Sequence, residues 1–225
     1  MCDNAGSNLV QVTSFGGPSV GTPRWSPDGR RIAFDGQGGI HVIDVDGGPS
    51  RRVASEHSDG VVPSWSRDGQ WIYFASPRTG RLEVWKVPAA GGQAVQITKR
   101  GGFAAFESQD GKSLYYAKGM NTAGLWSVAV NGGEEAPVLD FPKASFWGYW
   151  ALVETGIYFV NTEAKPQPAL QFLSFAGRRI VHIATLDRKP VPFVSGIAVS
   201  PDGGRILYTQ EDHRSSDIML VENFR

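Results

Sequence analysis

The sequence has few of the residues on which many catalytic and metal sites depend. Cys2 is the only cysteine, so no disulfide can form within the chain. The histidines lack the H-x-x-x-H spacing of a zinc site; they are His41, His57, His182 and His213. We therefore expect neither a metal nor a cofactor among the site residues.

Long apolar runs and an excess of charge of either sign are also missing. No run reaches the ~18 residues of a membrane span, so we expect no membrane insertion. The 22 Lys and Arg balance the 22 Asp and Glu, which argues against direct nucleic-acid binding. The polar start at residues 1–4 predicts no secretory leader. Both a cytoplasmic and a periplasmic location stay open.

One short motif resembles a hydrolase nucleophile. Residues 17–21 read G-P-S-V-G, which fits the G-x-S-x-G pattern. That pattern requires a strand before the serine and a helix after it, whereas here an expected strand follows. We interpret the motif as a connecting loop and expect no enzymatic activity.

Glycine and aromatic residues, in contrast, are abundant. Glycine accounts for 28 of 225 residues, well above the roughly 7% of average chains. Seven tryptophans and twelve phenylalanines require a core in which to pack. Together they predict a folded chain with many tight turns.

A turn motif repeats along the whole chain. It reads W-S-P-D-G at 25–29, W-S-R-D-G at 65–69, E-S-Q-D-G at 107–111 and V-S-P-D-G at 199–203, and V-E-T-G at 153–156 keeps only the glycine. We assign the turn glycines to Gly29, Gly69, Gly111, Gly156 and Gly203, with spacings of 40, 42, 45 and 47 residues. A period of ~40–50 residues is typical of propellers.

The segments around each turn alternate in the manner of strands. Each turn is followed by a triplet that consists of an aliphatic residue, a residue of any type and an aromatic residue. These triplets lie at 32–34, 72–74, 114–116, 157–159 and 206–208. A second strand is expected at 40–44, 82–87, 125–128, 170–173 and 218–221. A third is expected at 51–54, 94–98, 136–139 and 179–183, and one more precedes each turn, as at 62–66 and 196–200. Each unit is thus a four-stranded meander.

The aspartates of the motif have a structural interpretation. A carboxylate at this position accepts hydrogen bonds from nearby backbone amides, and the glycine after it tolerates positive φ. We assign these turn roles, rather than a catalytic ring, to Asp28, Gly29, Asp68, Gly69, Asp110, Gly111, Asp202 and Gly203.

The units predict an all-β propeller of five four-stranded blades in one domain, 1–225. The blades are expected at about 20–55, 61–99, 102–140, 144–185 and 193–222. The last unit lacks a fourth strand, whereas Leu9–Thr13 copies Ala94–Thr98 without a unit of its own. We therefore expect segment 8–14 to complete the last blade beside Ile218–Val221, which would close the ring. The alternative is a fragment of a larger propeller, as a monomer or a homo-oligomer.

The repeat resembles that of TolB-type, WD-repeat-like propellers. The resemblance rests on W-S-P-D-G-x-x-I-x-F at 25–34, its near copy at 65–74, the paired-glycine turns and V-Q-[IV]-T at 10–13 and 95–98. Residues 206–225 also resemble the C-terminal end of propellers in bacterial winged-helix, CadC-like regulators. These resemblances imply a periplasmic scaffold and a sensor domain, respectively. The motif residues build the fold, so neither resemblance implies a ligand site.

The expected binding surface is the rim around the central opening. Loops that join the blades surround this opening, and several carry cations followed by aromatic residues. The candidate residues are His57, Lys99, Arg100, Lys143, Trp147, Arg188 and Lys189. Because Arg and aromatic residues dominate binding hot spots, the rim predicts recognition of a protein, peptide or small ligand. The alternative is a solvated rim with aromatic residues that pack between blades.

We therefore expect a non-catalytic propeller for protein or ligand recognition. The most specific interpretation is that it is the sensor part of a transcriptional regulator. Three alternatives stay open: a periplasmic TolB-like scaffold, a hydrolase or lyase propeller without a recognisable site, and a chain engineered for propeller assembly.

Overall fold

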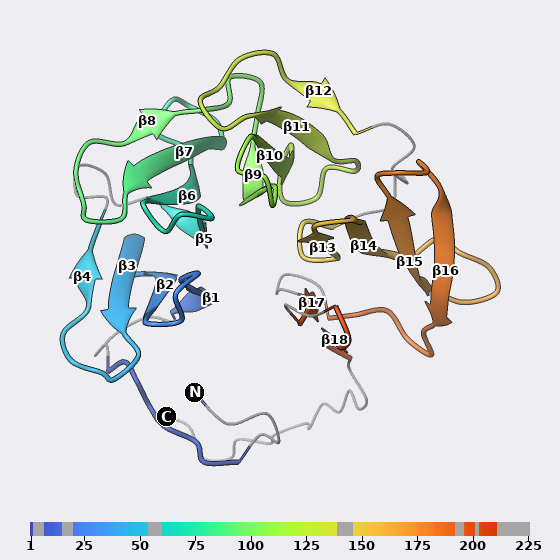
Figure 1. Ribbon diagram of the computed structural model, residues 1–225, viewed down its shortest axis with the longest axis horizontal. Helices are drawn as coiled ribbons and strands as arrows, with labels where there is room; N and C mark the ends of the chain where they lie inside the picture. The colour runs from blue at the N-terminus through green and yellow to red at the C-terminus, as the bar shows by residue number, and fades with distance from the viewer. Residues whose placement is uncertain are drawn as a thin grey trace, which may run out of the picture.

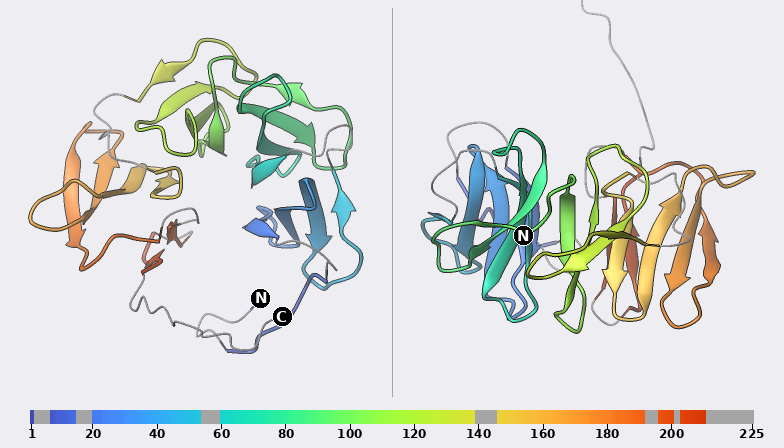
Figure 2. Two further views of the ribbon diagram at one scale, coloured as in Figure 1. Left: turned by 180° about the vertical axis from the view of Figure 1, so that it is seen from behind. Right: turned by 90° about the horizontal axis from the view of Figure 1, so that it is seen from above.

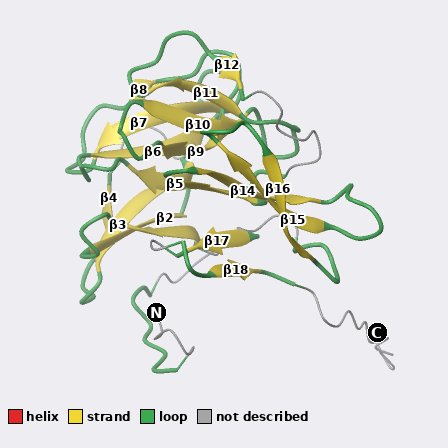
Figure 3. Ribbon diagram, turned by 45° about the vertical axis from the view of Figure 1, so that its right-hand side comes forward, coloured by secondary structure: helices red, strands yellow, loops and turns green. Residues whose placement is uncertain are grey.

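Strands are the only regular secondary structure in the part of the protein that the structure describes. In the computed structural model these are residues 1, 7–14, 20–53, 60–138, 146–191, 196–200 and 203–210. They contain eighteen strands and no helix (Figure 3). Consequently none of them forms a helix that could cross a membrane. The predicted all-β class is confirmed.

The strands form four sheets of four strands and one of two, all antiparallel and in chain order. The first sheet contains β1 (Gly21–Trp25), β2 (Arg31–Gly36), β3 (Gly39–Asp44) and β4 (Arg51–Arg52). The second contains β5 (Val61–Trp65), β6 (Trp71–Ser76), β7 (Glu83–Pro88) and β8 (Val95–Gln96). The third contains β9 (Phe103–Glu107), β10 (Ser113–Ala117), β11 (Trp126–Ala129) and β12 (Ala136–Pro137). The fourth contains β13 (Trp150–Val153), β14 (Gly156–Asn161), β15 (Ala169–Ser174) and β16 (Ile180–Thr185), and the fifth β17 (Ile197–Val199) and β18 (Ile206–Tyr208).

The five sheets stand side by side around a common axis as the blades of a propeller (Figures 1 and 2). The first strand of each blade lies nearest the axis, and β4, β8, β12 and β16 lie outermost (Figure 1). The predicted five-bladed propeller is therefore confirmed. We refer below to blades one to five in chain order.

The structure describes the predicted closing segment, 8–14, but not its expected partner strand. Residues 8–14 form no strand in the structure, and Val12 packs against a cluster of Ile32, Phe34 and Ile43 on blade one. The expected partner, Ile218–Val221, lies outside the described residues. The pairing of the two segments stays a prediction.

The core lies between the blades. One cluster joins Ala33, Ile40 and Val42 of blade one to Ile72 and Phe74 of blade two. Similar clusters join blades two and three, three and four, and four and five. Because each fully buried aliphatic or aromatic side chain contributes about 1.5–3 kcal/mol, stacking of blade on blade is the main source of stability.

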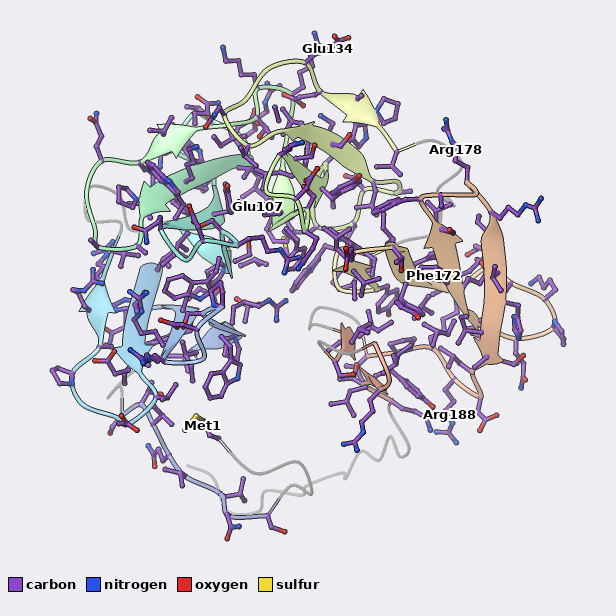
Figure 4. All side chains as sticks on the ribbon, in the orientation of Figure 1. Met1, Glu107, Glu134, Phe172, Arg178 and Arg188 are labelled. Carbon is purple, nitrogen blue, oxygen red and sulfur yellow. The ribbon has the colours of Figure 1, made fainter. Side chains whose placement is uncertain are left out.

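In blades two and three, polar links add to this stacking at the residue that opens the turn motif. In blade two, the indole Nε1 of Trp65 donates to the Arg24 carbonyl of blade one at 3.0 Å, and the Arg31 guanidinium lies 5.0 Å from the Trp65 ring centroid. Blade three has Glu107 at this position, labelled in Figure 4. Its carboxylate accepts from the Arg67 amide at 3.1 Å and from the Tyr73 hydroxyl, both in blade two. At this position a tryptophan donor in blade two and a glutamate acceptor in blade three thus each form a hydrogen bond to the preceding blade.

The turn aspartates lie where the motif predicts. Asp28 Oδ1 accepts from the Ser26 hydroxyl at 2.5 Å and from the Arg30 amide at 3.1 Å, and Asp68 and Asp110 repeat both contacts. The glycines that follow, and Gly203 in blade five, have φ near +68°. Asp202 lies outside the described residues.

The fourth turn differs from its expected form. We aligned Gly156 with the turn glycines, but it pairs with Val153 as the first residue of β14 and lacks positive φ. A Cβ there would lie 2.1 Å from the Leu173 carbonyl oxygen. The correction has a physical reason: Glu154 and Thr155 form a two-residue hairpin loop, and the glycine is required by close packing rather than by the turn.

The turn aspartates predict a loss of stability in acid. Hydrogen bonds from the serine hydroxyl, then from the backbone, lower the pKa of Asp28, Asp68 and Asp110. Since the pKa is lower in the folded state, the contribution is present above the unfolded pKa and is lost as the pH falls through the folded one. We expect urea midpoints to drop between pH 5 and pH 2, and less steeply when all three are replaced by Asn. Equal slopes would contradict this role.

Candidate binding site at the propeller axis

A pocket of about 580 Å³ lies at the axis, on the face where the inner strands begin. Blades one to four all contribute to its wall. The lining residues are Gly21, Thr22, Pro23, Arg24, Asp35, Val61, Val62, Leu82, Phe103, Met120 and Trp147. The site therefore exists only when several blades are assembled, as expected for a binding surface built on a rigid frame.

The backbone of the inner strands is strained at this pocket. Thr22, Val62 and Ala104 are the second residues of β1, β5 and β9, and all have φ between 43° and 52°. The pairing of these strands with the next strand shifts register at the same place. Such a conformation costs about 1–3 kcal/mol for a residue other than glycine and is concentrated at functional sites. Its recurrence in three blades indicates a bulge that shapes the pocket wall.

Asp35 and Arg24 place opposite charges in the pocket. Asp35 accepts from the Thr22 hydroxyl at 2.7 Å and from the Val62 amide at 3.3 Å, so its carboxylate joins blades one and two. A Cβ at Gly21 would lie 2.8 Å from Asp35 Oδ1, which explains the glycine. Burial lowers the pKa of Arg24, and attraction to Asp35 acts in the opposite direction. The Arg24 guanidinium lies 5.3 Å from the Phe106 ring centroid of blade three.

Aromatic and apolar side chains form the rest of the wall. Trp147 is buried and meets Phe103 edge to face, with centroids 5.6 Å apart. The Phe146 ring also contacts Trp147, with centroids 5.5 Å apart. Met120, on the loop between β10 and β11, is 42% exposed at the pocket. A deformable methionine beside rigid aromatic rings suits an apolar ligand group.

The predicted rim residues are spread over several places. Trp147 lines the pocket. Lys99 and Arg100 are exposed, and their amides donate to Glu135 Oε1 of blade three at 2.7 and 3.2 Å. Arg188 and Lys189 are exposed just after β16. His57 and Lys143 lie outside the described residues.

Asp35 lines the candidate site but was not predicted from the repeat. It follows the aliphatic-any-aromatic triplet, and the same position holds Ala75, Ala117 and Val160 in blades two to four. The two alanines are buried in a cluster with Phe103 and Trp147. A charged residue where the repeat requires a small apolar one was the available signal.

Among the residues that the structure describes, no three His, Cys, Asp or Glu side chains are grouped to hold a metal ion. Those that line the axial pocket include one carboxylate and one guanidinium, but no serine, cysteine, histidine or lysine. Within this lining the only hydroxyl is that of Thr22, and it donates to Asp35 at 2.7 Å.

Comparisons with known proteins agree with this architecture. A family model described as the PD40 TolB β-propeller domain matches residues 3–187. The uncharacterized protein Atu1656 of Agrobacterium fabrum is 36% identical over 78 residues, which cover 33% of this chain and 27% of that protein. The Tol-Pal system protein TolB of Anaeromyxobacter dehalogenans is 36% identical over 109 residues, covering 48% and 25% of the two chains. The chain thus spans about a quarter of the length of these relatives.

A solved structure shows the same fold. TolB from Acinetobacter baumannii superposes with a TM-score of 0.77 at 19% identity, over 94% of this chain and 53% of that chain. At this identity the likeness concerns the fold alone. The family match covers residues 3–187, which is most of the sequence. The chain belongs to the TolB β-propeller family.

Proposed function

We propose that this chain is a non-catalytic recognition propeller that binds a segment of a partner protein in the axial pocket. The observation that carries the proposal is the wall itself, in which four blades combine apolar and aromatic surface with one carboxylate and one guanidinium. Binding sites commonly consist of an apolar pocket with few polar groups that orient the ligand. Strained backbone around the pocket supports a role beyond packing.

A protein is the favoured partner because two relatives of this chain are named as proteins of the Tol-Pal system. The enzyme alternative has less support, because the Thr22 hydroxyl and the Val62 amide both donate to Asp35 and give this carboxylate a structural role between blades one and two. The sensor role implied by the resemblance to CadC-like regulators stays a prediction.

The proposal is tested by placing a charge at the mouth of the pocket. Met120 is 42% exposed, so Met120→Arg is expected to leave the fold intact while its guanidinium occupies apolar binding surface. We expect affinity for a cross-linked and identified native partner to fall at least about tenfold, equivalent to about 1.4 kcal/mol. Isothermal titration calorimetry with the purified partner provides the measurement.

Val95→Arg is the matched control. Val95 is apolar and 48% exposed, but it lies on the outer strand β8 and does not line the pocket. Affinity should stay at the wild-type value in this variant. Equal affinities for wild type and Met120→Arg would reject the axial site. Turnover in a hydrolase and lyase screen that Met120→Arg abolishes would favour the enzyme alternative.

A further inference from the structure

The outer strand of blade four differs from those of blades one to three. The strands β4, β8 and β12 have two residues each, whereas β16 has six and reads Ile-Val-His-Ile-Ala-Thr. Ile180, Val181 and Ile183 are 40%, 49% and 45% exposed. Native edge strands are usually short or carry charges and prolines, which prevent pairing with other chains. The interior of β16 has neither charge nor proline.

The backbone of β16 has one side available for pairing. Within the described residues, β16 pairs only with β15, as the last strand of its sheet. The Ser174 amide donates to the Arg179 carbonyl at 2.9 Å, which makes these two residues a hydrogen-bonded pair. Since such pairs alternate in antiparallel strands, Ile180 and His182 direct their amides and carbonyls away from β15. Figure 1 shows this side of β16 at the periphery of the ring.

Cations are concentrated at both ends of the strand. Arg178 and Arg179 precede β16, and Arg188 and Lys189 follow it, against the single anion Asp187. All five are exposed. Arg178 and Arg188 are labelled in Figure 4 at opposite ends of β16. The edge therefore combines an apolar centre with a positive flank on each side.

We propose that β16 is a docking edge for an extended segment of a partner protein, with β-branched residues at its centre and acidic residues at both ends. The segment adds as a fifth strand to blade four, with main-chain hydrogen bonds to Ile180 and His182. The acidic ends face the two cationic flanks, which supplies charge complementarity. A second copy fits less well, because antiparallel pairing of two β16 strands brings Arg178 and Arg179 next to Arg188 and Lys189.

The test uses a synthetic peptide, Asp-Glu-Thr-Val-Thr-Val-Thr-Val-Glu-Asp, and a second peptide in which Lys replaces every acidic residue. We expect the acidic peptide to bind at least about tenfold more tightly. Amide hydrogen exchange should slow at Ile180 and His182 in the complex. Arg179→Glu combined with Lys189→Glu should reduce binding by about tenfold or more, because both residues are exposed and repel the acidic ends once reversed.

The matched control reverses two exposed cations elsewhere, Arg30→Glu with Lys112→Glu, on the turns of blades one and three. This pair changes the net charge equally and should leave peptide affinity unchanged. Equal binding of both peptides, equal loss in the two charge-reversed pairs, or unchanged exchange at Ile180 and His182 would overturn the proposal. Peptide-independent dimers that protect these two amides would assign the edge to a second copy instead. Because Met120 lies in the axial pocket, Met120→Arg should not affect binding of the peptide to β16. The proposals for the axial pocket and for β16 can therefore be rejected independently of each other.

Discussion

Replacement of Trp65 by alanine is expected to lower the free energy of unfolding by about 3–5 kcal/mol, as is usual for a buried tryptophan. Trp65 is 8% exposed, packs in the core between blades one and two, and donates to the Arg24 carbonyl. Its removal creates a cavity and leaves this carbonyl without the indole donor. Urea unfolding followed by far-UV circular dichroism measures the change.

Trp25→Ala is the natural control, because Trp25 begins the same motif in blade one. Trp25 is 55% exposed and lines an open groove of about 570 Å³ beside Val10 and Val12. We expect a loss of no more than about 1 kcal/mol for a surface position of this kind. Similar losses in the two variants would mean that Trp25 is covered in solution by another blade or by a partner.

Replacement of Glu135 by alanine is expected to cost about 3–5 kcal/mol, the usual result of breaking a buried ion pair. Its carboxylate accepts from the Lys99 amide at 2.7 Å, the Tyr116 hydroxyl at 2.8 Å and the Lys118 ammonium. Without it, the buried Tyr116 hydroxyl loses its acceptor and Lys118 loses its counter-ion. The loss should appear both in the unfolding midpoint and in faster amide exchange at Lys99 and Arg100.

The neighbouring Glu134 is the matched control. Glu134 is exposed (Figure 4), and Glu134→Ala should change stability by no more than about 0.5 kcal/mol. Burial raises the pKa of Glu135, but hydrogen bonds from Lys118 and the Lys99 amide outweigh this and lower it overall. The stabilisation is therefore lost as the pH falls through this lowered pKa. A Glu135→Ala protein as stable as Glu134→Ala at pH 7 would contradict the assignment.

The meander of each blade could be predicted because its signals are local. Turn chemistry at Asp28 and Gly29, and alternation such as Ile32-Ala33-Phe34, act over a few residues and do not depend on the neighbouring blade. The lengths of the outer strands differ from the expected ones: β8 covers only Val95–Gln96 of the predicted 94–98, whereas β16 extends to Thr185 beyond the predicted 179–183. Outer strands pair on one side alone, so tertiary contacts rather than propensity decide their length.

The candidate site could be predicted only in part. Trp147 was singled out from its place after a blade-joining loop, and it lines the axial pocket. Arg24 of β1, Asp35 of β2 and Met120 of the loop after β10 line it too, but they come from three separate segments in two blades. No pattern in the sequence brings them together, because the curvature of the ring determines which strand ends meet.

The sequence by itself determined the repeating unit, its turns and therefore the propeller, since a motif that recurs every forty-odd residues produces blades that must cover one another's apolar faces. Only the tertiary structure decided in which copies of the turn motif the first residue is buried against a neighbouring blade. Trp25 and Trp65 begin the same motif, yet one is exposed and the other buried. The difference arises because burial depends on the neighbouring blade, a contact that lies about forty residues away along the chain.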